Sequence, residues 1–308
     1  MKEIKNVFFL GIGAIGAKYA SQFYDKSPEN VYVIVDENRK KKYESEGVFI
    51  NNKEYKFKYI TTPDPNISVD LIILGVKSNN LEESLVFLKP FLQSDTVILS
   101  LLNGITTVDK INEGLQTDQA LYSIVYMDAV KNGNKITYNH PGKFVFGESF
   151  NYSLTQRVLA VQHFFDIYGI NYEVPEDMIL SLWRKYLINV VGNQLTFILN
   201  VGYEGLQDNP YILNLVQLVG EEVIRVANAK NIDLAQIDID NMIKTMRMLP
   251  GKAMTSMHQD RLADRISEVE IFAGEMIKIG KEVGVSTPYN NMMYNLIKGY
   301  EWERDFRD

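Results

Sequence analysis

Lys185, Asn189 and Asn193 are the residues whose type and spacing most clearly suggest chemistry. They follow one another at intervals of four, so on a helix they share one face. Most residues between them are apolar, and polar side chains on a largely buried helix are costly unless they have partners. The stripe could simply face solvent. It could instead line a ligand site, where asparagine binds hydroxyl groups and a partly desolvated lysine, with a lowered pKa, gives up a proton near neutral pH.

Other candidate residues lie near the ends of predicted elements. Lys77 follows a buried strand predicted over residues 70–76, and Asn103 follows another over 96–102. Residues at the carboxyl ends of parallel strands face the ligand crevice, although Asn103-Gly104 is also a common turn. Ser256 lies in a polar stretch at 255–260. Glu268 is expected to begin a helix and, taken alone, is typical of a surface glutamate.

A glycine-rich segment follows the first predicted strand, at residues 4–10, and opens a helix. It reads Gly11-Ile12-Gly13-Ala14-Ile15-Gly16, the spacing G-x-G-x-x-G. In a dinucleotide site the glycines permit a tight turn, close approach of the pyrophosphate and close packing of helix on strand. We therefore expect Gly11, Gly13, Ala14, Ile15 and Gly16 to bind the cofactor, with its pyrophosphate at the helix N-terminus. A tight turn without a ligand is the alternative.

The segment after the second predicted strand bears on the choice of cofactor. Asp36 ends that strand, twenty residues after Gly16, and can accept hydrogen bonds from the adenosine ribose hydroxyls, which favours NAD. Arg39 follows at once and could reach the 2′-phosphate of NADP. The basic run Arg39 to Lys42 is also consistent with a solvated helix face. NADH and NADPH both stay open, with a lean toward NADH.

Strands and helices alternate as far as about residue 174, and long helical periodicities follow without a convincing strand. This pattern predicts a Rossmann-type, doubly wound, mostly parallel α/β sheet followed by an all-α domain. We expect a dinucleotide-binding domain at residues 1–174 and a substrate and catalytic domain at 175–308. Within the first, residues 135–138 and 143–147 are expected to pair with each other as antiparallel strands around His140-Pro141-Gly142.

Composition narrows the function further. The 308 residues carry a net charge of −7, with no cysteine and three histidines. An acidic chain has no overall attraction for nucleic acid or for an anionic membrane. Thiol chemistry is excluded, and the histidines share no metal-ligand spacing, so we expect no metal site. Without a long apolar stretch beyond the glycine-rich start, we expect a cytoplasmic protein. The helical domain could support a homodimer, for which the sequence shows no specific mark.

Taken together, these residues resemble the ketopantoate reductase (2-dehydropantoate 2-reductase) family, in order and over almost the whole chain. The resemblance rests on the glycine motif, Val76-Lys77, Asn103-Gly104, Trp183-Arg184-Lys185 with Asn189 and Asn193, and Ser256-Met257-x-Gln259-Asp260 with Glu268. It implies reduction of the ketone of a small 2-keto acid, 2-dehydropantoate, to (R)-pantoate in pantothenate and coenzyme A synthesis. The family norm for the hydride donor is NADPH.

The resemblance also implies roles for individual residues. Lys185 is the general acid that protonates the developing alkoxide, and Glu268 binds a substrate hydroxyl and orients the site. Asn189 and Asn193 bind substrate hydroxyl groups, and Ser256 holds the carboxylate. Lys77 and Asn103 line the cofactor–substrate junction near the nicotinamide.

Two departures from the family pattern leave alternatives open. Asp36-Glu37-Asn38-Arg39 stands where many members carry an arginine for the 2′-phosphate. The third substrate-binding asparagine has no clear equivalent, since either Asn200 or Tyr203 lies near its place. The chain could therefore reduce a different 2-keto acid. A dinucleotide-binding sensor without catalysis is a further alternative, which the presence of both Lys185 and Glu268 disfavours.

Overall fold

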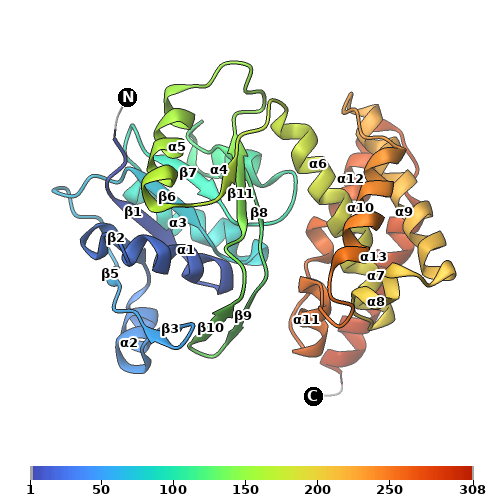
Figure 1. The fold of residues 1–308 in the computed structure, drawn as a ribbon, viewed down its shortest axis with the longest axis horizontal. Helices are drawn as coiled ribbons and strands as arrows, with labels where there is room; N and C mark the ends of the chain where they lie inside the picture. The colour runs from blue at the N-terminus through green and yellow to red at the C-terminus, as the bar shows by residue number, and fades with distance from the viewer. Residues whose placement is uncertain (1–2, 307–308) are drawn as a thin grey trace. The chain divides into compact units, whose positions relative to one another are not determined.

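The computed structural model of the chain describes residues 3–306. The chain divides into two compact units, Met1–Met178 and Ile179–Asp308. Figure 1 shows a sheet with helices in the first unit and helices in the second. The predicted fold class, a Rossmann-type sheet followed by an all-helical part, is confirmed. The sequence places the boundary at residues 174–175, a few residues before this division.

A parallel sheet of five strands forms the centre of the first unit, in the order β5-β2-β1-β6-β7. Its strands are β1 (Val7–Leu10), β2 (Val31–Ile34), β5 (Lys58–Ile60), β6 (Leu71–Leu74) and β7 (Val97–Ser100). All but β5 are short apolar runs buried on both faces, as expected where helices cover both sides of a sheet. The strand order reverses between β1 and β6, and ligands bind beyond the carboxyl ends of strands at such a switch point.

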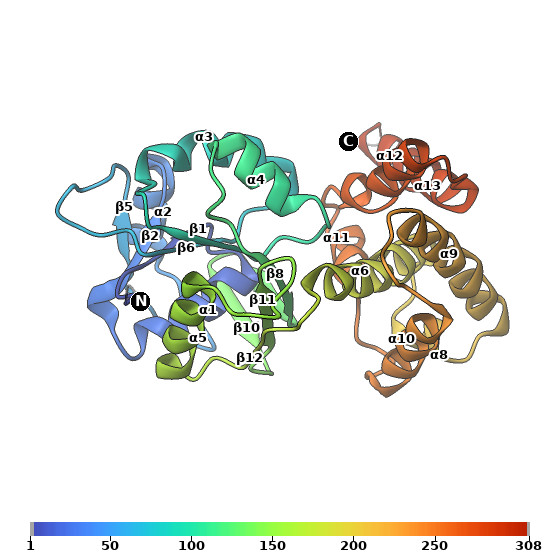
Figure 2. The same ribbon diagram turned by 90° about the horizontal axis from the view of Figure 1, so that it is seen from above.

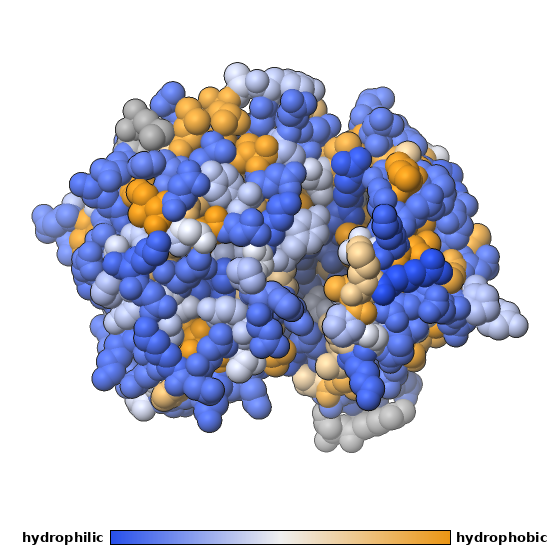
Figure 3. All heavy atoms as spheres, in the orientation of Figure 1, coloured by the Kyte–Doolittle hydropathy of each residue, from blue (hydrophilic) through white to orange (hydrophobic). Residues whose placement is uncertain are grey.

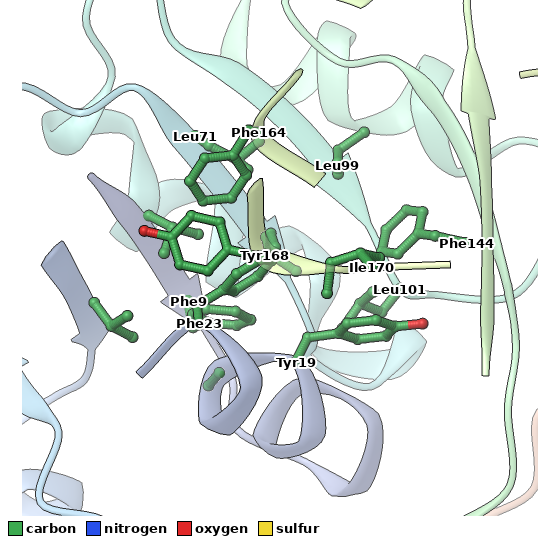
Figure 4. Packing of buried hydrophobic residues seen from close by; sticks show 14 of the residues in the cluster. Phe9, Tyr19, Phe23, Leu71, Leu99, Leu101, Phe144, Phe164, Tyr168 and Ile170 are labelled. Carbon is green, nitrogen blue, oxygen red and sulfur yellow. The ribbon is translucent and has the colours of Figure 1, made fainter. Parts of the chain in front are cut away.

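Helices pack on both faces of this sheet (Figure 2). One face carries α1 (Ala14–Tyr24) and α5 (Gln156–Tyr168), and the other α3 (Leu81–Leu88) and α4 (Thr107–Leu115). Successive strand residues point to opposite faces, so Phe9 packs in the first layer and Phe8 in the second. Figure 4 shows Phe9 beside Phe23 and Tyr168, within the aromatic cluster that fastens α1 and α5 to the sheet. This packing holds the start of α1 against the end of β1.

Two smaller sheets complete the first unit, and here one prediction is wrong. One sheet has the order β4-β3-β10-β9 and the other β12-β11-β8. Their strands are β3 (Phe49–Ile50), β4 (Lys53–Glu54), β8 (Tyr122–Tyr126), β9 (Ala129–Asn132), β10 (Lys135–Tyr138), β11 (Lys143–Gly147) and β12 (Tyr172–Glu173). The expected pairing of residues 135–138 with 143–147 does not form, because β10 pairs with β9 and β11 with β8. Gly133-Asn134, with Gly133 at φ +60°, makes the tight turn that joins β9 to β10.

The second unit is built from helices. They are α6 (Met178–Ile188, which starts at the last residue of the first unit), a π-helical turn η4 (Asn189–Asn193), α7 (Gln194–Leu199), α8 (Tyr203–Gln207), α9 (Pro210–Ala229), α10 (Gln236–Met248), α11 (Ser256–Leu262), a 3₁₀ turn η5 (Val269–Ile271), α12 (Ala273–Val283) and α13 (Pro288–Asp305). The helix expected from residue 177 to 199 is thus interrupted by a wider turn. The helix expected to begin at Glu268 is instead a short 3₁₀ turn, and α12 starts only at Ala273.

The surface visible in Figure 3 is mostly hydrophilic on each unit, with smaller groups of hydrophobic residues between. Among residues 3–306, no helix combines the length and the hydropathy that a membrane crossing requires.

Candidate functional site

The glycine loop closes against the strand beside it. Gly11 has φ +95°, and a Cβ there would lie 2.7 Å from the carbonyl carbon of Gly75, just after β6. A Cβ on Gly16 or on Gly75 would lie 2.5 Å from the Gly11 carbonyl oxygen. None of the three positions accepts a side chain without backbone movement. The loop therefore lies at the β1–β6 switch point, where Gly75, which is outside the G-x-G-x-x-G motif, is a fourth glycine in close contact.

The start of α1 fits the pyrophosphate of a dinucleotide. Gly13 precedes the helix in an extended conformation, and no side chain caps the helix there. The first backbone N–H groups of a helix have no intrahelical acceptor and carry the positive end of its dipole. Those at Ala14, Ile15 and Gly16 are thus suited to a phosphate anion. All five residues predicted from the glycine motif lie together in this loop.

The carboxylate of Asp36 contacts Arg39, three residues further along the chain. It precedes α2 (Glu37–Glu46), and its Oδ1 accepts a 2.7 Å hydrogen bond from the backbone N–H of Arg39. Its Oδ2 lies 3.4 Å from Nε of Arg39 in a half-exposed ion pair. The carboxylate thus caps a helix, a role that its position before a polar helix could have suggested. Its contact with a ribose stays a prediction.

Lys77 and Asn103 follow adjacent strands of the parallel sheet. Lys77 is exposed and comes three residues after β6, where it precedes a short 3₁₀ turn η2 (Ser78–Asn80). Asn103 comes three residues after β7, and its carbonyl accepts a 2.9 Å hydrogen bond from Oγ1 of Thr107 at the start of α4. Because β6 and β7 are parallel neighbours, both residues lie at the same edge of the sheet as the glycine loop.

In the second unit, Lys185 lies near the end of α6 with Glu268 as its electrostatic partner. Burial lowers the pKa of Lys185 from 10.5 to about 8, and the negative charge of Glu268 opposes this shift. Trp183 and Tyr186, which flank this part of α6, are buried and pack edge to face. A lysine in such surroundings remains mostly protonated near neutral pH but releases its proton far more readily than an exposed lysine.

The π-helical turn carries Asn189 and Asn193, and both side chains are buried. Nδ2 of Asn193 donates to Oδ1 of Asn189 at 3.0 Å, and Oγ of Ser256 reaches Oδ1 of Asn193 at 3.4 Å. The structure therefore brings three predicted site residues into one hydrogen-bonded chain. Single π-turns within helices occur frequently at functional sites. No sequence signal marked this turn, because a continuous helix also places the two asparagines on one face.

Hydrogen bonds of the residues around Glu268 fix the position of its segment. Glu301 of α13 is buried, and its Oε1 accepts the backbone N–H of Ser267 at 2.8 Å. Oε1 of Glu270 accepts from the hydroxyl of Tyr294 in α13 at 2.9 Å. Bonds on both sides of Glu268 thus tie its segment to α13, which limits the positions that its carboxylate can take.

A second buried hydrogen-bond network lies next to the π-helical turn. Glu222 of α9 is fully buried and accepts the backbone N–H groups of Tyr289 and Asn290 and the side-chain amide of Asn290, at 2.8–3.0 Å. Nε2 of Gln194, directly after the turn, lies 3.4 Å from Oδ1 of Asn290. Sequence reasoning missed Glu222, although its spacing from Val219 and Val226 puts a carboxylate on the apolar face of α9 and could have marked it.

The two candidates for a third asparagine have different environments. Asn200 ends α7 in the left-handed conformation, with φ 55°, and its Oδ1 lies 3.2 Å from Nε2 of the buried His258. Tyr203 begins α8, and its backbone N–H donates to the carbonyl of Ala253 at 3.0 Å. Within residues 3–306 no group of three or more histidine, cysteine or carboxylate side chains is placed to hold a metal ion.

A glycine loop on a doubly wound sheet, followed by a helical unit with a partly buried lysine, is the architecture of a dinucleotide-dependent oxidoreductase. Two family models match the chain: ketopantoate reductase PanE/ApbA over residues 7–150 and ketopantoate reductase PanE/ApbA C terminal over residues 177–301. The chain belongs to the ketopantoate reductase family. The predicted enzyme class, an NAD(P)-dependent oxidoreductase that acts on a CH–OH group, is confirmed by this membership.

Individual relatives agree with this assignment. The chain is 26% identical over 304 residues to the 2-dehydropantoate 2-reductase of a Nostoc species, with 94% of this chain and 93% of the relative covered. It is 27% identical over 305 residues to the 2-dehydropantoate 2-reductase of Pyrococcus horikoshii, with 96% and 97% covered.

Solved structures share the fold. A ketopantoate reductase family protein of Ralstonia eutropha matches with a TM-score of 0.84 at 21% identity, and D-mandelate dehydrogenase in complex with NADH with 0.85 at 23%. Each match covers 97% of this chain and 99% of the other.

Proposed function

We propose that the protein is a 2-dehydropantoate 2-reductase, which reduces the ketone of 2-dehydropantoate to (R)-pantoate with NADH or NADPH, in pantothenate and coenzyme A synthesis. The observation that carries this proposal is the pair of Lys185, with its pKa near 8, and Glu268, in the unit that also holds the Asn189–Asn193–Ser256 chain. Relatives bearing this activity's name match almost the whole chain, which supports the choice of substrate.

The cofactor, when bound at the glycine loop, would supply the hydride that reduces the ketone carbon. Lys77 and Asn103, at the same sheet edge as that loop, are proposed to contact its nicotinamide side.

Lys185 is proposed to hold the proton that the reaction needs. In its protonated form it stabilises the negative charge that develops on the ketone oxygen, then transfers a proton from Nζ to that oxygen. Glu268 is proposed to accept a hydrogen bond from the substrate hydroxyl and, by its charge, to keep Lys185 protonated up to about pH 8. Without that carboxylate, the pKa of Lys185 would fall further.

The asparagines and the serine are proposed to bind the remaining polar groups of the substrate. Asn193 already uses Nδ2 and Oδ1 within the chain, so its side chain is oriented before a substrate arrives. Asn189 accepts at Oδ1 and is left with its amide N–H groups to donate to a hydroxyl. The exposed Ser256 is proposed to donate to the carboxylate.

The test is consumption of NADH and of NADPH, followed by nicotinamide absorbance, on addition of 2-dehydropantoate to the purified full chain. We expect turnover that Lys185→Ala removes while the far-UV circular dichroism spectrum stays the same. No turnover with either cofactor would contradict an enzymatic role with this substrate.

A second candidate, a reductase of another 2-keto acid, is favoured by the contact between Asn200 and His258. That hydrogen bond occupies Oδ1 of the asparagine nearest to the place of the family's third substrate-binding asparagine. A panel of 2-keto acids separates the two functions. A kcat/KM for 2-dehydropantoate well above that of every other acid supports the first function and excludes the second.

A further inference from the structure

Two buried threonine hydroxyls connect the π-helical turn η4 to the start of α11. Thr196, in the first turn of α7, has a fully buried side chain, and Thr255, the residue before α11, is buried as well. Their Oγ1 atoms lie 2.6 Å apart, across 59 positions of the chain. Thr255 directly precedes Ser256, and Thr196 follows Asn193 by three positions. Each hydroxyl thus belongs to a residue close to one end of the contact between Asn193 and Ser256.

The neighbouring contacts assign the protons of this pair. Oγ1 of Thr196 donates to the carbonyl of Gly192 at 2.8 Å, and the carbonyl of Asn193 lies within reach at 3.1 Å. Because a hydroxyl has one proton to donate, Thr196 must be the acceptor in its contact with Thr255. Thr255 in turn accepts the backbone N–H of His258 and so caps α11. The hydrogen bonds therefore run in one direction, from α11 into the backbone of the turn.

The hydroxyl of Thr196 also helps to shape the turn. Thr196 bonds the carbonyl four residues before it, and so does Gln194, whose Nε2 donates to the carbonyl of Val190 at 2.7 Å. Side chains that bond back to the carbonyl at i−4 compete with the backbone N–H groups of a helix and often bend it. Both side chains are fully buried, so these bonds are shielded from water. The turn that carries Asn189 and Asn193 is therefore held by two side chains in addition to its backbone bonds.

The direct contact between Asn193 and Ser256 is too weak to fix the geometry by itself. Its length of 3.4 Å exceeds the usual O–H···O distance of about 2.7–2.8 Å. Ser256 is also exposed, so water competes for its hydroxyl. The contact between Thr196 and Thr255 is shorter, at 2.6 Å, and buried, where a hydrogen bond is electrostatically stronger than in water. The threonine pair is therefore the contact that fixes the distance between the turn and Ser256.

We propose that Thr196 is a positioning residue of the reaction: through Thr255, its hydroxyl holds Ser256 and Asn193 at the spacing that the substrate requires. This inference rests on the proposed function, because it takes Ser256 and Asn193 to bind the substrate. In this role Thr196 touches no reacting atom and acts only through the residues that it holds. A substrate bound by two groups at once is sensitive to a displacement of about 1 Å between them.

The test is steady-state kinetics of the full chain with 2-dehydropantoate and NADH or NADPH, combined with urea denaturation. Thr196→Val keeps the shape of the side chain but removes the hydroxyl, which leaves the proton of Thr255 without its acceptor. We expect KM for the keto acid to rise about tenfold or more, with kcat changed less than about threefold. KM for the cofactor should stay at the wild-type value.

Thr196→Ser separates positioning from stability. It keeps the hydroxyl but deletes a buried methyl group, so it should lower the free energy of unfolding. Because the hydrogen bond to Thr255 can still form, its KM for the keto acid should stay within about twofold of wild type. A threonine with a merely structural role would instead raise KM wherever it lowers stability.

Thr245→Val is a matched control. Oγ1 of Thr245 in α10 also donates to the carbonyl four residues before it, that of Asn241 at 2.8 Å, but at an exposed position. Its replacement should leave kcat and both KM values unchanged.

A double-mutant cycle tests whether the two hydroxyls act together. Thr255→Val alone should raise KM for the keto acid in the same direction as Thr196→Val. If the effect passes through their mutual hydrogen bond, the double variant should raise KM about as much as the more damaging single variant. A rise equal to the product of the two single effects would contradict the inference.

Two further results would overturn the inference while leaving the proposed function intact. In one, wild-type protein turns over 2-dehydropantoate and Thr196→Val does so with the same KM. In the other, Thr196→Ser raises KM as much as Thr196→Val, which would show that the residue is only structural. If wild-type protein does not turn over 2-dehydropantoate with either cofactor, the proposed function fails and the inference fails with it.

Discussion

Asn193 donates a hydrogen bond to Asn189 across one turn of π-helix, at 3.0 Å between Nδ2 and Oδ1. This hydrogen bond fixes the orientation of both side-chain amides. Oγ of Ser256 in turn donates to Oδ1 of Asn193, so that three side chains are linked by hydrogen bonds. The wider turn keeps the two buried amides within hydrogen-bond distance of each other. The pair therefore holds two oriented amide groups in the second unit, at the positions proposed to bind the substrate.

Replacing Asn193 should impair substrate binding more than the chemical step. In Asn193→Ala, both Asn189 and Ser256 lose their partner, so we expect KM for the keto acid to rise about tenfold to hundredfold with a smaller change in kcat. Steady-state kinetics at saturating cofactor measure both. The matched control is Asn295→Ala, because Asn295 makes the same kind of contact to Asn291 on the exposed face of α13, at 2.9 Å. A KM that stays at the wild-type value in Asn193→Ala would show that the amide pair is structural.

Lys185 should impose a pH limit on catalysis. A general acid must carry its proton, and the pKa of Lys185 is lowered to about 8. We therefore expect kcat to be level below that pH and to fall as pH rises past about 8. Lys185→Met should lower kcat by about 100-fold to 10,000-fold and abolish this limb of the profile. Lys278→Met, on the exposed face of α12, should retain the wild-type profile. A wild-type kcat that keeps rising from pH 7 to 10 would contradict the assignment.

Gly75 should be as intolerant of a side chain as the glycines of the motif. A Cβ there lies 2.5 Å from the Gly11 carbonyl oxygen, so the loop and β6 must separate. We expect Gly75→Ala to lower the free energy of unfolding by about 3 kcal/mol and to remove measurable cofactor binding. Chemical denaturation and calorimetry report the two effects separately. Gly299→Ala is the control, since no atom lies within 4 Å of its added Cβ. Cofactor affinity that survives Gly75→Ala would indicate that the ligand does not bind at this loop.

Lys18 of α1 should make the protein less stable at neutral pH than at alkaline pH. Its side chain is buried, with Nζ 3.8 Å from the centre of the Tyr19 ring, and burial lowers its pKa from 10.5 to about 8. The unfolded chain then binds a proton more readily than the folded chain, so Lys18 reduces stability below about pH 8 and this penalty disappears toward pH 10.5.

Lys18→Met should therefore raise the free energy of unfolding at pH 7 by up to about 3 kcal/mol and have little effect near pH 10. Urea denaturation at the two pH values measures the difference. Lys56→Met, at an exposed position of the same unit, should change neither value. A Lys18→Met variant that is less stable than wild type at pH 7 would show that the ammonium contributes a favourable contact.

The sequence allows prediction of those parts of the fold that depend on local patterns. Short apolar strands, the glycine spacing and the amphipathic helices identified the parallel sheet and the helical unit, because each pattern is contained in a few neighbouring residues. The predicted pairing of β10 with β11 was wrong, because strand pairing depends on contacts between segments that are distant in the sequence. The tight turn at Gly133-Asn134, which would have revealed β9, was overlooked beside the longer break at His140-Pro141-Gly142.

In the candidate site, too, the residues that share a local pattern could be predicted, and the residues that meet only through distant contacts could not. Lys185, Asn189 and Asn193 could be grouped from their helical spacing, and Ser256 only through the family resemblance. The contact between Thr196 and Thr255 could not be found in this way, since it joins segments that lie 59 positions apart in the sequence. Asp36 was predicted to end the second strand, and it does precede α2. Its role as a helix cap was not predicted, because that role depends on the contacts that its carboxylate makes with the backbone N–H and the side chain of Arg39.

The mutual contact of Gly11, Gly16 and Gly75 has a consequence for the thermodynamics of cofactor binding. With no room for a side chain at any of the three, the loop takes its shape when the first unit folds and has few alternatives to lose afterwards. The conformational entropy of ordering the loop is then a cost of folding rather than of binding. Association at this loop should consequently be rapid and nearly free of backbone rearrangement.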